Sequence, residues 1–325
     1  MKKQKPRILV ITPTKHIKDL NKTLESIGHV EYFNDPTKEE VKNIIKKFDV
    51  VFTNPNKSKV FLGKDVLENA KNLKIICTAS TGTNHIDKKF AKEKGIEVLS
   101  ITNERRIINS ISSTAEHAFC LTLASIRNVN HSYNDVLKGN WDYTNFIGRQ
   151  LNFLNIGVIG YGRLGKMYAH YCNAFGSKVF VFDPYKEVKS KKIKQSRSLE
   201  QLVKVSDIIS IHVHVNDETI NMLDENYFKL MKKNVLLVNT SRGEVINEND
   251  LKKFLELNPK AKFATDVLSD EILGIKQNII LDYAKNNKSQ VLITPHIGGM
   301  TSEAQLIAYT HAANLLKCSV KKIKE

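Results

Sequence analysis

The chain has 325 residues, of which 41% are hydrophobic, and this combination predicts a globular protein of two domains rather than a disordered chain. Its net charge of +16 comes mostly from lysines spread over nearly every segment, without the clustered arginines and aromatic residues that read nucleic-acid bases. We therefore expect no nucleic-acid partner, although a basic surface can steer anionic cofactors and acids.

Residues 7 to 102 alternate between short strand patterns and helix patterns. The strand patterns, rich in valine and isoleucine, cover 7–12, 30–33, 49–53, 73–78 and 96–101, and the helix patterns cover 19–27, 38–47, 64–71 and 87–94. Strands that alternate with helices predict a parallel sheet with right-handed crossovers. We therefore predict a small doubly wound α/β domain in this part of the chain.

The loop of residues 78–87, Thr-Ala-Ser-Thr-Gly-Thr-Asn-His-Ile-Asp, follows the fourth of these strands. Ligands of open α/β sheets bind beyond the carboxyl ends of the strands, and the backbone N–H groups of such a turn suit a carboxylate. On these residues alone, an ordinary strand-to-helix turn is the simpler interpretation, and a carboxylate site is the alternative.

Two helical segments are expected to connect the domains. Ser113-Thr-Ala-Glu116 has the pattern of a capping box and predicts the start of an apolar helix that runs to about Arg127. Residues 302–316 form an amphipathic pattern, and we expect this last helix to return to the first domain. The predicted domains are therefore residues 1–102 with 301–325, and residues 103–300.

The most informative stretch of the chain is residues 154–166, Leu-Asn-Ile-Gly-Val-Ile-Gly-Tyr-Gly-Arg-Leu-Gly-Lys. An apolar run is followed by Gly160, Gly162 and Gly165 at G-x-G-x-x-G spacing, and then by a helix pattern. In a dinucleotide-binding turn the first glycine allows the tight turn, the second lets the backbone approach a pyrophosphate, and the third lets the helix pack against the strand. The pyrophosphate then lies at the helix N-terminus.

The next apolar run, residues 178–182, leads into Asp183, twenty-one residues after Gly162. A carboxylate at this place accepts hydrogen bonds from the adenosine ribose hydroxyls and repels the 2′-phosphate of NADP. The order of strand, glycines, helix, strand and acid predicts a Rossmann site for NAD. Lysines at positions 186, 189, 191 and 192 would weaken the preference for NAD over NADP.

The rest of the second domain continues the alternation, with helix patterns at 198–205, 221–233 and 248–255 and strand patterns at 208–213, 235–240, 261–267 and 291–294. Polar residues follow three of these strands: Arg242, Asp266 with Glu271, and His296 between a proline and a glycine pair. The planar fork of an arginine holds a carboxylate bidentately, and a histidine suits proton transfer. Arg242 and His296 are therefore candidate catalytic residues, and His212 is a second candidate histidine.

The four cysteines, Cys77, Cys120, Cys172 and Cys318, are far apart and have neither a metal-ligand spacing nor a disulfide pattern. No apolar run is long enough for a signal peptide or a membrane span. We therefore expect buried free thiols, no bound metal, no membrane partner and a cytoplasmic location.

Taken in order, these motifs resemble those of the D-isomer-specific 2-hydroxyacid dehydrogenases. The resemblance covers roughly residues 75–300, and it rests on the glycine motif, Asp183, residues 238–243 (Val-Asn-Thr-Ser-Arg-Gly), Asp266 with Glu271, residues 294–299 (Thr-Pro-His-Ile-Gly-Gly), and the segments 80–87 and 114–116. It implies two doubly wound domains, a Rossmann NAD-binding domain inserted into a flavodoxin-like substrate domain. It also implies a homodimer joined through the NAD-binding domains, to which we expect the helix from Thr114 to Arg127 to contribute, and a short form without a regulatory domain.

The resemblance also implies roles for individual residues. Arg242 would bind the carboxylate and carbonyl of the substrate, His296 would donate or accept the proton, and Glu271 would pair with His296. The backbone at Thr81 and Gly82 would hold the substrate carboxylate. Asp266 would contact the nicotinamide carboxamide, and the full set of cofactor positions would be Gly160, Gly162, Arg163, Leu164, Gly165, Asp183, Val213 and His214 (both on the adenine side), Thr219, Thr240, Ser241, Arg242, Asp266, His296 and Gly298.

Three features depart from the family pattern. His214 stands where a proline is usual, the segment 101–113 with Arg105 and Arg106 is longer than usual, and a lysine-rich insertion reaching Ser289 follows Glu271 without the expected proline. The last two features concern the substrate rather than the reaction.

The implied activity is the NAD-dependent interconversion of a D-2-hydroxy acid and its 2-keto acid. Because Arg105 and Arg106 could meet a phosphate, 3-phosphoglycerate is one candidate substrate, while glycerate, lactate and longer sugar acids stay open. The alternative is an NAD-sensing corepressor-like binding protein of the same fold, which the basic charge slightly favours. The presence of Arg242, Glu271 and His296 together favours catalysis.

Overall fold

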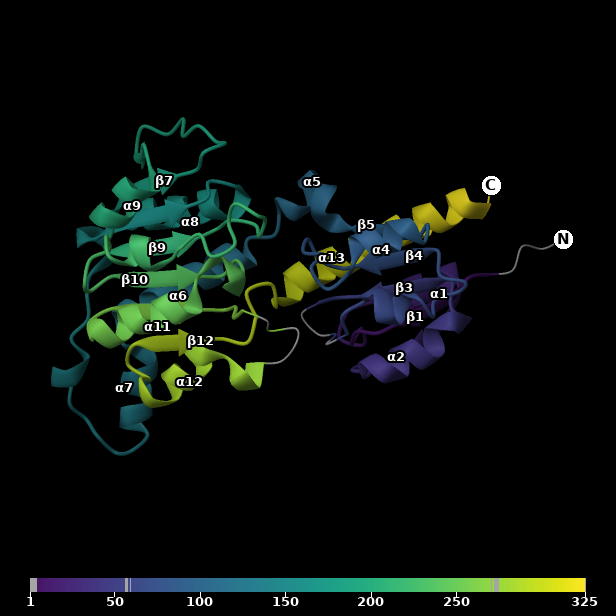
Figure 1. The fold of residues 1–325 in the computed structure, drawn as a ribbon, viewed down its shortest axis with the longest axis horizontal. Helices are drawn as coiled ribbons and strands as arrows, with labels where there is room; N and C mark the ends of the chain where they lie inside the picture. The colour runs from purple at the N-terminus through teal and green to yellow at the C-terminus, as the bar shows by residue number, and fades with distance from the viewer. Residues whose placement is uncertain (1–4, 56–57, 59, 270, 272–274, 325) are drawn as a thin grey trace. The chain divides into compact units, whose positions relative to one another are not determined.

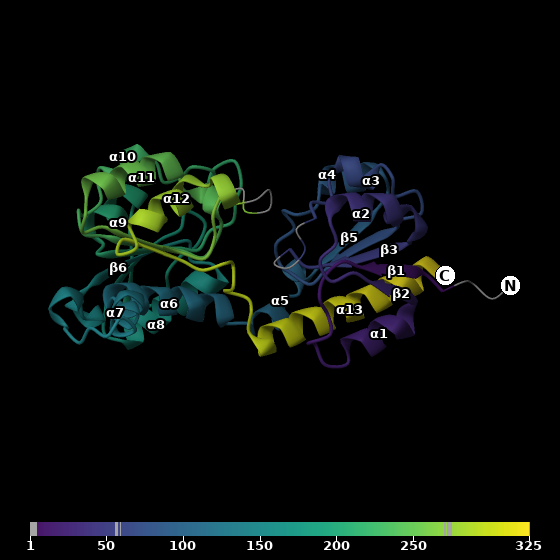
Figure 2. The same cartoon turned by 90° about the horizontal axis from the view of Figure 1, so that it is seen from below.

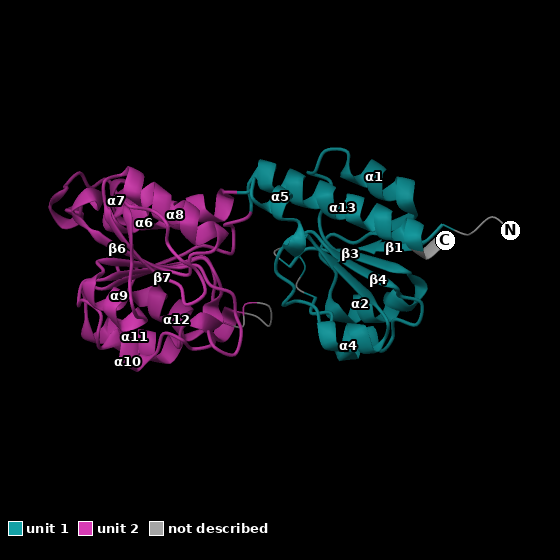
Figure 3. Ribbon diagram, turned by 90° about the horizontal axis from the view of Figure 1, so that it is seen from above, with its two compact units in different colours: residues 1–111, 300–325 teal, residues 112–299 magenta. Residues whose placement is uncertain are grey.

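The computed structural model describes residues 5–55, 58, 60–269, 271 and 275–324 (Figure 1). The chain forms two compact units: unit 1 comprises residues 1–111 and 300–325, and unit 2 comprises residues 112–299 (Figure 3). The first crossing between the units therefore lies between Ile111 and Ser112, whereas we predicted it at residues 102 and 103. The reason is packing, because Ile101, Ile108 and Ile111 all contact the core of unit 1.

Unit 1 contains a five-stranded parallel sheet. Its strands are β1 (Arg7–Val10), β2 (His29–Tyr32), β3 (Val50–Thr53), β4 (Ile75–Thr78) and β5 (Glu97–Ser100), in the order β2-β1-β3-β4-β5. In the register of the central strand, Ile8 pairs with Val30 on one side and with Val50 on the other. This is the flavodoxin-like order, so the predicted fold of the first domain is confirmed.

Helices cover both faces of this sheet (Figure 2). One face packs against α1 (Leu20–Ile27) and α13 (Ser302–Lys324), and the other against α2 (Lys38–Ile44), α3 (Lys64–Leu67) and α4 (Lys88–Glu93). In β1, Ile8 and Val10 face the first pair of helices, while Leu9 faces the second group. Burial on both faces explains why these strands are apolar throughout. The short helix α5 (Arg105–Ile108) packs against α13, which runs well beyond the predicted residue 316.

Unit 2 contains a seven-stranded parallel sheet, in the order β12-β11-β10-β9-β6-β7-β8. The order reverses between β6 and β9, which is the switch point where Rossmann folds bind dinucleotides. The predicted Rossmann fold is therefore confirmed. The three-residue edge strand β8 is too short for its pattern to be seen in the sequence, and the full set of strands is β6 (Asn155–Ile159), β7 (Lys178–Phe182), β8 (Ile193–Gln195), β9 (Ile208–Ile211), β10 (Leu236–Asn239), β11 (Lys262–Thr265) and β12 (Val291–Ile293).

Two groups of helices enclose this sheet (Figure 2). One face packs against α6 (Ser113–Ile126) and α8 (Arg163–Ala174), and the other against α9 (Leu199–Val205), α10 (Glu225–Phe228), α11 (Glu248–Leu257) and α12 (Ile279–Asn286). The helix α7 (Val129–Val136) follows α6 along the chain. Short 3-10 helices occupy 45–47, 101–103, 144–146, 151–153, 243–245 and 275–277.

Several local predictions were wrong. The pattern at 221–233 forms only the four-residue α10 between turns, α7 was not predicted, and α12 forms inside the segment that we interpreted as an insertion. The predicted capping box is also displaced, because α6 begins at Ser113 and its N-cap Ser112 donates its hydroxyl to Glu116 at 2.5 Å. Two cysteines are exposed rather than buried, Cys120 and Cys318. Among the residues that the structure describes, no helix has the length and apolar character needed to cross a membrane.

Candidate active site

The glycine loop follows β6 at the switch point of the unit 2 sheet. Gly160 has a φ of +89°, and a Cβ on this residue would lie 2.6 Å from the carbonyl oxygen of His212. A Cβ on Gly165 would lie 2.0 Å from the carbonyl oxygen of Gly160, whereas among the described atoms nothing lies within 4 Å of a Cβ on Gly162. Gly160 therefore allows a left-handed turn, Gly162 an open approach for a ligand, and Gly165 the close packing of helix on strand.

The N-terminus of α8 and the side chain of Asp183 flank this loop. Arg163, Leu164 and Gly165 are the first residues of α8, so their amides have no acceptor within the helix. Burial lowers the pKa of Arg163. The Asp183 carboxylate accepts the N–H of Tyr161 at 2.7 Å through Oδ2 and the N–H of Tyr185 at 2.9 Å through Oδ1. These two bonds fix the carboxylate beside the glycine loop.

The loop after β9 lies against the glycine loop. The Val213 Cγ1 atom lies 2.9 Å from the position that a Cβ on Gly160 would take. The Thr219 hydroxyl donates to the carbonyl oxygen of His214 at 2.6 Å, which closes the loop on itself. The Nε2 atom of His212 lies 2.9 Å from the Ser210 hydroxyl, and burial lowers the pKa of His212 to about 3. His212 is therefore neutral near pH 7, and its side chain is a packing element rather than a second acid–base group.

Arg242 lies on a turn organised by Asn239, the last residue of β10. The buried Asn239 amide donates to the carbonyl oxygen of Arg242 at 2.8 Å and accepts the Ser241 N–H at 2.9 Å. The Nη1 atom of Arg242 donates to the Ser241 carbonyl at 2.6 Å, and the guanidinium is partly exposed. Within the described part of the chain, the buried Thr240 hydroxyl has no hydrogen-bond partner.

His296 and Glu271 are in direct contact. The Nδ1 atom of His296 lies 2.5 Å from the Glu271 Oε1 atom, and both side chains are partly exposed, at 26% and 21%. His296 has a φ of +54°, a left-handed conformation that is uncommon for a residue other than glycine. Because Nδ1 faces the carboxylate, Nε2 is the ring nitrogen left for a ligand.

Asp266 is 2% exposed and holds the loop that carries His296. Its carboxylate accepts the N–H groups of Ile297 at 2.8 Å and Gly298 at 2.7 Å, and the Thr294 hydroxyl at 2.5 Å. From α6, the Nε2 atom of His117 lies 2.9 Å from the Thr294 hydroxyl and 3.3 Å from Asp266 Oδ1. Burial acts to raise the pKa of Asp266, but these hydrogen bonds outweigh it and the pKa is lowered.

The sequence reasoning missed His117. A histidine in an otherwise apolar helix pattern predicts only a helical position, and nothing near it in the sequence points to Asp266. The resemblance assigned Asp266 to the nicotinamide carboxamide, and this role stays a prediction; in the structure its carboxylate accepts hydrogen bonds from the following loop.

Thr81, Gly82, Arg105 and Arg106 all belong to unit 1. The carbonyl oxygen of Thr81 accepts the Thr102 hydroxyl at 2.6 Å, and the carbonyl oxygen of Gly82 accepts the Ser80 hydroxyl at 2.6 Å. These bonds fix the peptide planes of the loop after β4. Arg105 and Arg106 are exposed on α5.

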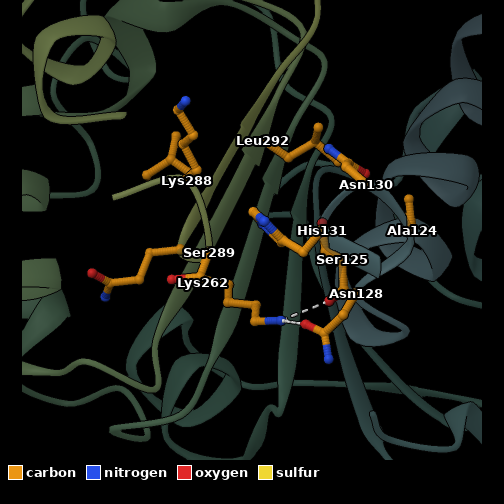
Figure 4. Close-up of a pocket in the computed structure, with 11 residues that line it drawn as sticks. Ala124, Ser125, Asn128, Asn130, His131, Lys262, Lys288, Ser289 and Leu292 are labelled. Carbon is orange, nitrogen blue, oxygen red and sulfur yellow. Dashed lines mark hydrogen bonds between the residues drawn. The ribbon is translucent and has the colours of Figure 1, made fainter. Parts of the chain in front are cut away.

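A cavity of about 10 Å³ lies at the end of the unit 2 sheet where β11 and β12 begin, away from Asp266 and His296 (Figure 4). The Lys262 Nζ atom points toward α6 and donates to the Ser125 carbonyl at 2.9 Å and to Asn128 Oδ1 at 2.5 Å. Lys262 begins β11, whereas Asp266 follows the end of that strand. A cavity of this size holds about one water molecule, so it is not a substrate site.

The chain resembles known proteins in sequence. Residues 119–298 match the family model described as D-isomer specific 2-hydroxyacid dehydrogenase, NAD binding domain. The chain is 34% identical over 314 residues to the D-3-phosphoglycerate dehydrogenase of Methanocaldococcus jannaschii. The matched residues cover 96% of this chain and 57% of that protein. It is 33% identical over 273 residues to the hydroxypyruvate reductase of Thermotoga maritima, which covers 82% of this chain and 83% of that protein. The chain spans about half the length of the phosphoglycerate dehydrogenases that it matches.

Solved structures share the fold over nearly the whole chain. The D-lactate dehydrogenase of Aquifex aeolicus, complexed with NAD and lactic acid, has a TM-score of 0.82 at 30% identity and covers 97% of this chain and 96% of its own. An acyclic imino acid reductase in complex with NADPH and D-Arg has a TM-score of 0.79 at 27% identity, with 97% of each chain covered. The family match spans more than half of the chain and contains the glycine loop, Asp183 and the His296–Glu271 pair. This chain therefore belongs to the D-isomer specific 2-hydroxyacid dehydrogenase family, and residues 119–298 match its NAD-binding domain.

Proposed function

We propose that this protein interconverts a D-2-hydroxy acid and its 2-keto acid with NAD. The observation that carries the proposal is the contact between His296 and Glu271, an acid–base pair next to the carboxyl edge of a Rossmann sheet. An NAD-sensing binding protein of the same fold has no need of such a pair, so the pair favours catalysis over the corepressor alternative.

The glycine loop fits a dinucleotide. Gly162 leaves open space at the N-terminus of α8, and a pyrophosphate in that space would lie on the helix amides. A side chain at this position would occupy the same space. Asp183, held by the amides of Tyr161 and Tyr185, suits the ribose hydroxyls of the adenosine half. When bound, the nicotinamide supplies or accepts the hydride.

The residues of this chain would handle the substrate and the proton. The Arg242 fork binds the substrate carboxylate and polarises the carbonyl that is reduced. In reduction, the protonated His296 gives its Nε2 proton to the developing alkoxide, and in oxidation the neutral ring takes the proton back. The Glu271 carboxylate orients the ring through Nδ1 and favours its protonated form.

The cofactor preference follows from Asp183. We propose that the native protein uses NADH in preference to NADPH, because the fixed carboxylate repels a 2′-phosphate. Asp183→Ser should narrow the ratio of kcat/KM for the two cofactors, measured with one keto acid at fixed pH. Equal kcat/KM values for NADH and NADPH in the native protein would overturn this assignment.

The substrate would be a short 2-keto acid or its D-hydroxy counterpart. Relatives are named for phosphoglycerate, hydroxypyruvate and glyoxylate, and the exposed Arg105 and Arg106 suit a phosphate.

The test is NADH oxidation with hydroxypyruvate, glyoxylate and pyruvate, together with NAD reduction by 3-phosphoglycerate. We expect turnover of at least one acid, and loss of that turnover in Arg242→Ala. An Arg105→Ser/Arg106→Ser variant should raise the KM of the phosphorylated acid alone. No turnover of any acid, despite NADH binding, would favour the corepressor alternative.

We also propose that the protein is a homodimer joined through unit 2. The segment from α7 to residue 153, which Figure 1 shows running away from the sheet of unit 2, carries half of the sixteen exposed large apolar side chains of the described chain. Exposed apolar side chains gathered in one segment support an interaction site there. The eight residues are Val129, Tyr133, Val136, Leu137, Trp141, Tyr143, Ile147 and Phe153.

This segment follows the helix that we expected to contribute to the interface, α6. Light scattering at micromolar concentration should give twice the 36.9 kDa mass of the chain, and Leu137→Glu should give monomers. The matched control is Leu257→Glu, because Leu257 is an exposed leucine elsewhere on unit 2, at 81% against 67% for Leu137. A monomeric native protein would contradict the proposal.

A further inference from the structure

The loop that carries His296 is wound around a buried carboxylate, and its backbone adds a hydrogen bond from the His296 N–H to the Thr294 carbonyl oxygen at 3.0 Å. Asp266 accepts hydrogen bonds from Thr294, Ile297 and Gly298, so it binds the loop on both sides of His296. The carbonyl oxygen of Asp266 also accepts the His296 N–H at 3.0 Å. A non-glycine residue keeps a left-handed conformation only where its surroundings over-determine it. Asp266 therefore determines the conformation of His296.

His117 in turn holds the Asp266 carboxylate. The Thr294 hydroxyl donates its hydrogen to Asp266, so its oxygen is left to accept the Nε2–H of His117 at 2.9 Å. The same Nε2 atom lies 3.3 Å from Asp266 Oδ1. His117 is thus the donor that α6 contributes to both partners, and its side chain is only 16% exposed.

The loop also packs directly on α6. A Cβ on Gly298 would lie 3.0 Å from Asp266 Oδ2 and 3.3 Å from the Thr114 Cγ2 atom. Thr114 and His117 stand three residues apart and therefore share one face of the helix. That face of α6 is the support on which the loop 294–298 rests.

We propose that His117 is a positioning residue for the reaction: through Thr294 and Asp266, it sets the place and orientation of the His296 ring. The proposal rests on the proposed function, in which His296 moves the proton. Among the described residues, the charged group in contact with the His296 ring is Glu271, and the one in contact with His117 is Asp266. Loss of the His117 donor loosens the loop and thereby weakens the contact between His296 and Glu271.

The test compares His117→Leu, which removes the donor, with His117→Gln, whose side-chain amide restores an N–H at similar reach. His170→Leu, an exposed histidine on α8, is the matched control. We expect His117→Leu to lower kcat for keto-acid reduction by about 10–100-fold, because a small misplacement of a catalytic group has this effect. NADH affinity should stay unchanged in all three variants, and His117→Gln should recover kcat.

A second measurement separates positioning from mere stability. With ¹³C-labelled histidine, NMR follows the protonation of the His296 ring in the free protein, assigned by His296→Gln. In His117→Leu the ring should lose its proton at a lower pH than in the native protein, and His117→Gln should reverse the change. If His117→Leu does not fold, Thr294→Val removes the hydroxyl between His117 and Asp266. In that variant the His296 ring should likewise lose its proton at a lower pH than in the native protein.

Native kcat and a native His296 titration in the donor-free variant would overturn the proposal. The titration needs no substrate. The titration therefore decides the role of His117 even if the native protein reduces no 2-keto acid. That absence of turnover would contradict the proposed function instead.

Discussion

Two loops at the same edge of the unit 2 sheet are built in different ways. The glycine loop is local: Gly160, Gly162 and Gly165 lie within one turn, and each acts through the side chain that it lacks. The loop of His296 is assembled from three segments, because Asp266 follows another strand and His117 lies 177 residues before Thr294 on another element. Backbone shape therefore governs the proposed dinucleotide site, whereas side-chain hydrogen bonds over long sequence separations hold His296, the proposed acid–base group.

The comparison predicts that the two loops fail separately, and His296→Ala should show the largest effect. It removes the proposed proton donor and should lower kcat by about 10²–10⁴-fold. NADH affinity should change little, because the glycine loop is untouched. Steady-state kinetics together with NADH fluorescence titration check this. A comparable loss of NADH affinity would show that the two loops are not independent.

The glycine loop can be broken in two distinguishable ways. Gly165→Ala places a Cβ 2.0 Å from the Gly160 carbonyl oxygen, so it should cost about 1–3 kcal/mol of unfolding free energy by overpacking. Gly162→Ala places its Cβ more than 4 Å from every described atom that could hinder it, so it should leave stability unchanged while weakening NADH binding. Denaturant unfolding and NADH titration of both variants decide the matter. Equal stability of the two variants would contradict this division of roles.

Glu271→Gln tests the contact between Glu271 and the loop that carries His296. The neutral amide removes the charge that favours the protonated His296, so keto-acid reduction should decline with rising pH from a lower pH than in the native protein. The measurement is kcat/KM against pH for both proteins. If the decline stays in place or moves to higher pH, Glu271 does not act on His296.

The last prediction concerns stability rather than turnover, at His212, whose carbonyl oxygen closely approaches the glycine loop. Its ring has a pKa of about 3 in the folded protein, against about 6.5 in the unfolded chain. The unfolded chain therefore takes up a proton below pH 6.5 that the folded protein does not. The free energy of unfolding should fall as the pH drops from about 6.5 toward 3, by up to about 1.4 kcal/mol per pH unit. Unfolding curves of native protein and His212→Gln at pH 7.5 and 5 test this, because the variant should lose less stability.

The sequence by itself determined the α/β class, a parallel sheet in each domain and the Rossmann fold, although it missed the edge strand β8. These features depend on patterns within about thirty residues, such as apolar strands, glycine spacing and a following acid, and the physics of each pattern is local. The sequence-based prediction was wrong where local patterns compete. The helix pattern at 221–233 forms only the single turn of α10, which is capped by Asp224.

Only the tertiary structure decided how His296, the proposed acid–base group, is held. The contact of His117 with Thr294 and Asp266 depends on α6 lying across β10 and β11, and no spacing in the sequence encodes that packing. The same holds for the crossing at Ile111, which shifts because residues 101–111 bury apolar side chains in unit 1. Burial and long-range hydrogen bonds arise between segments that meet only after folding, so their consequences lie beyond any local reading of the chain.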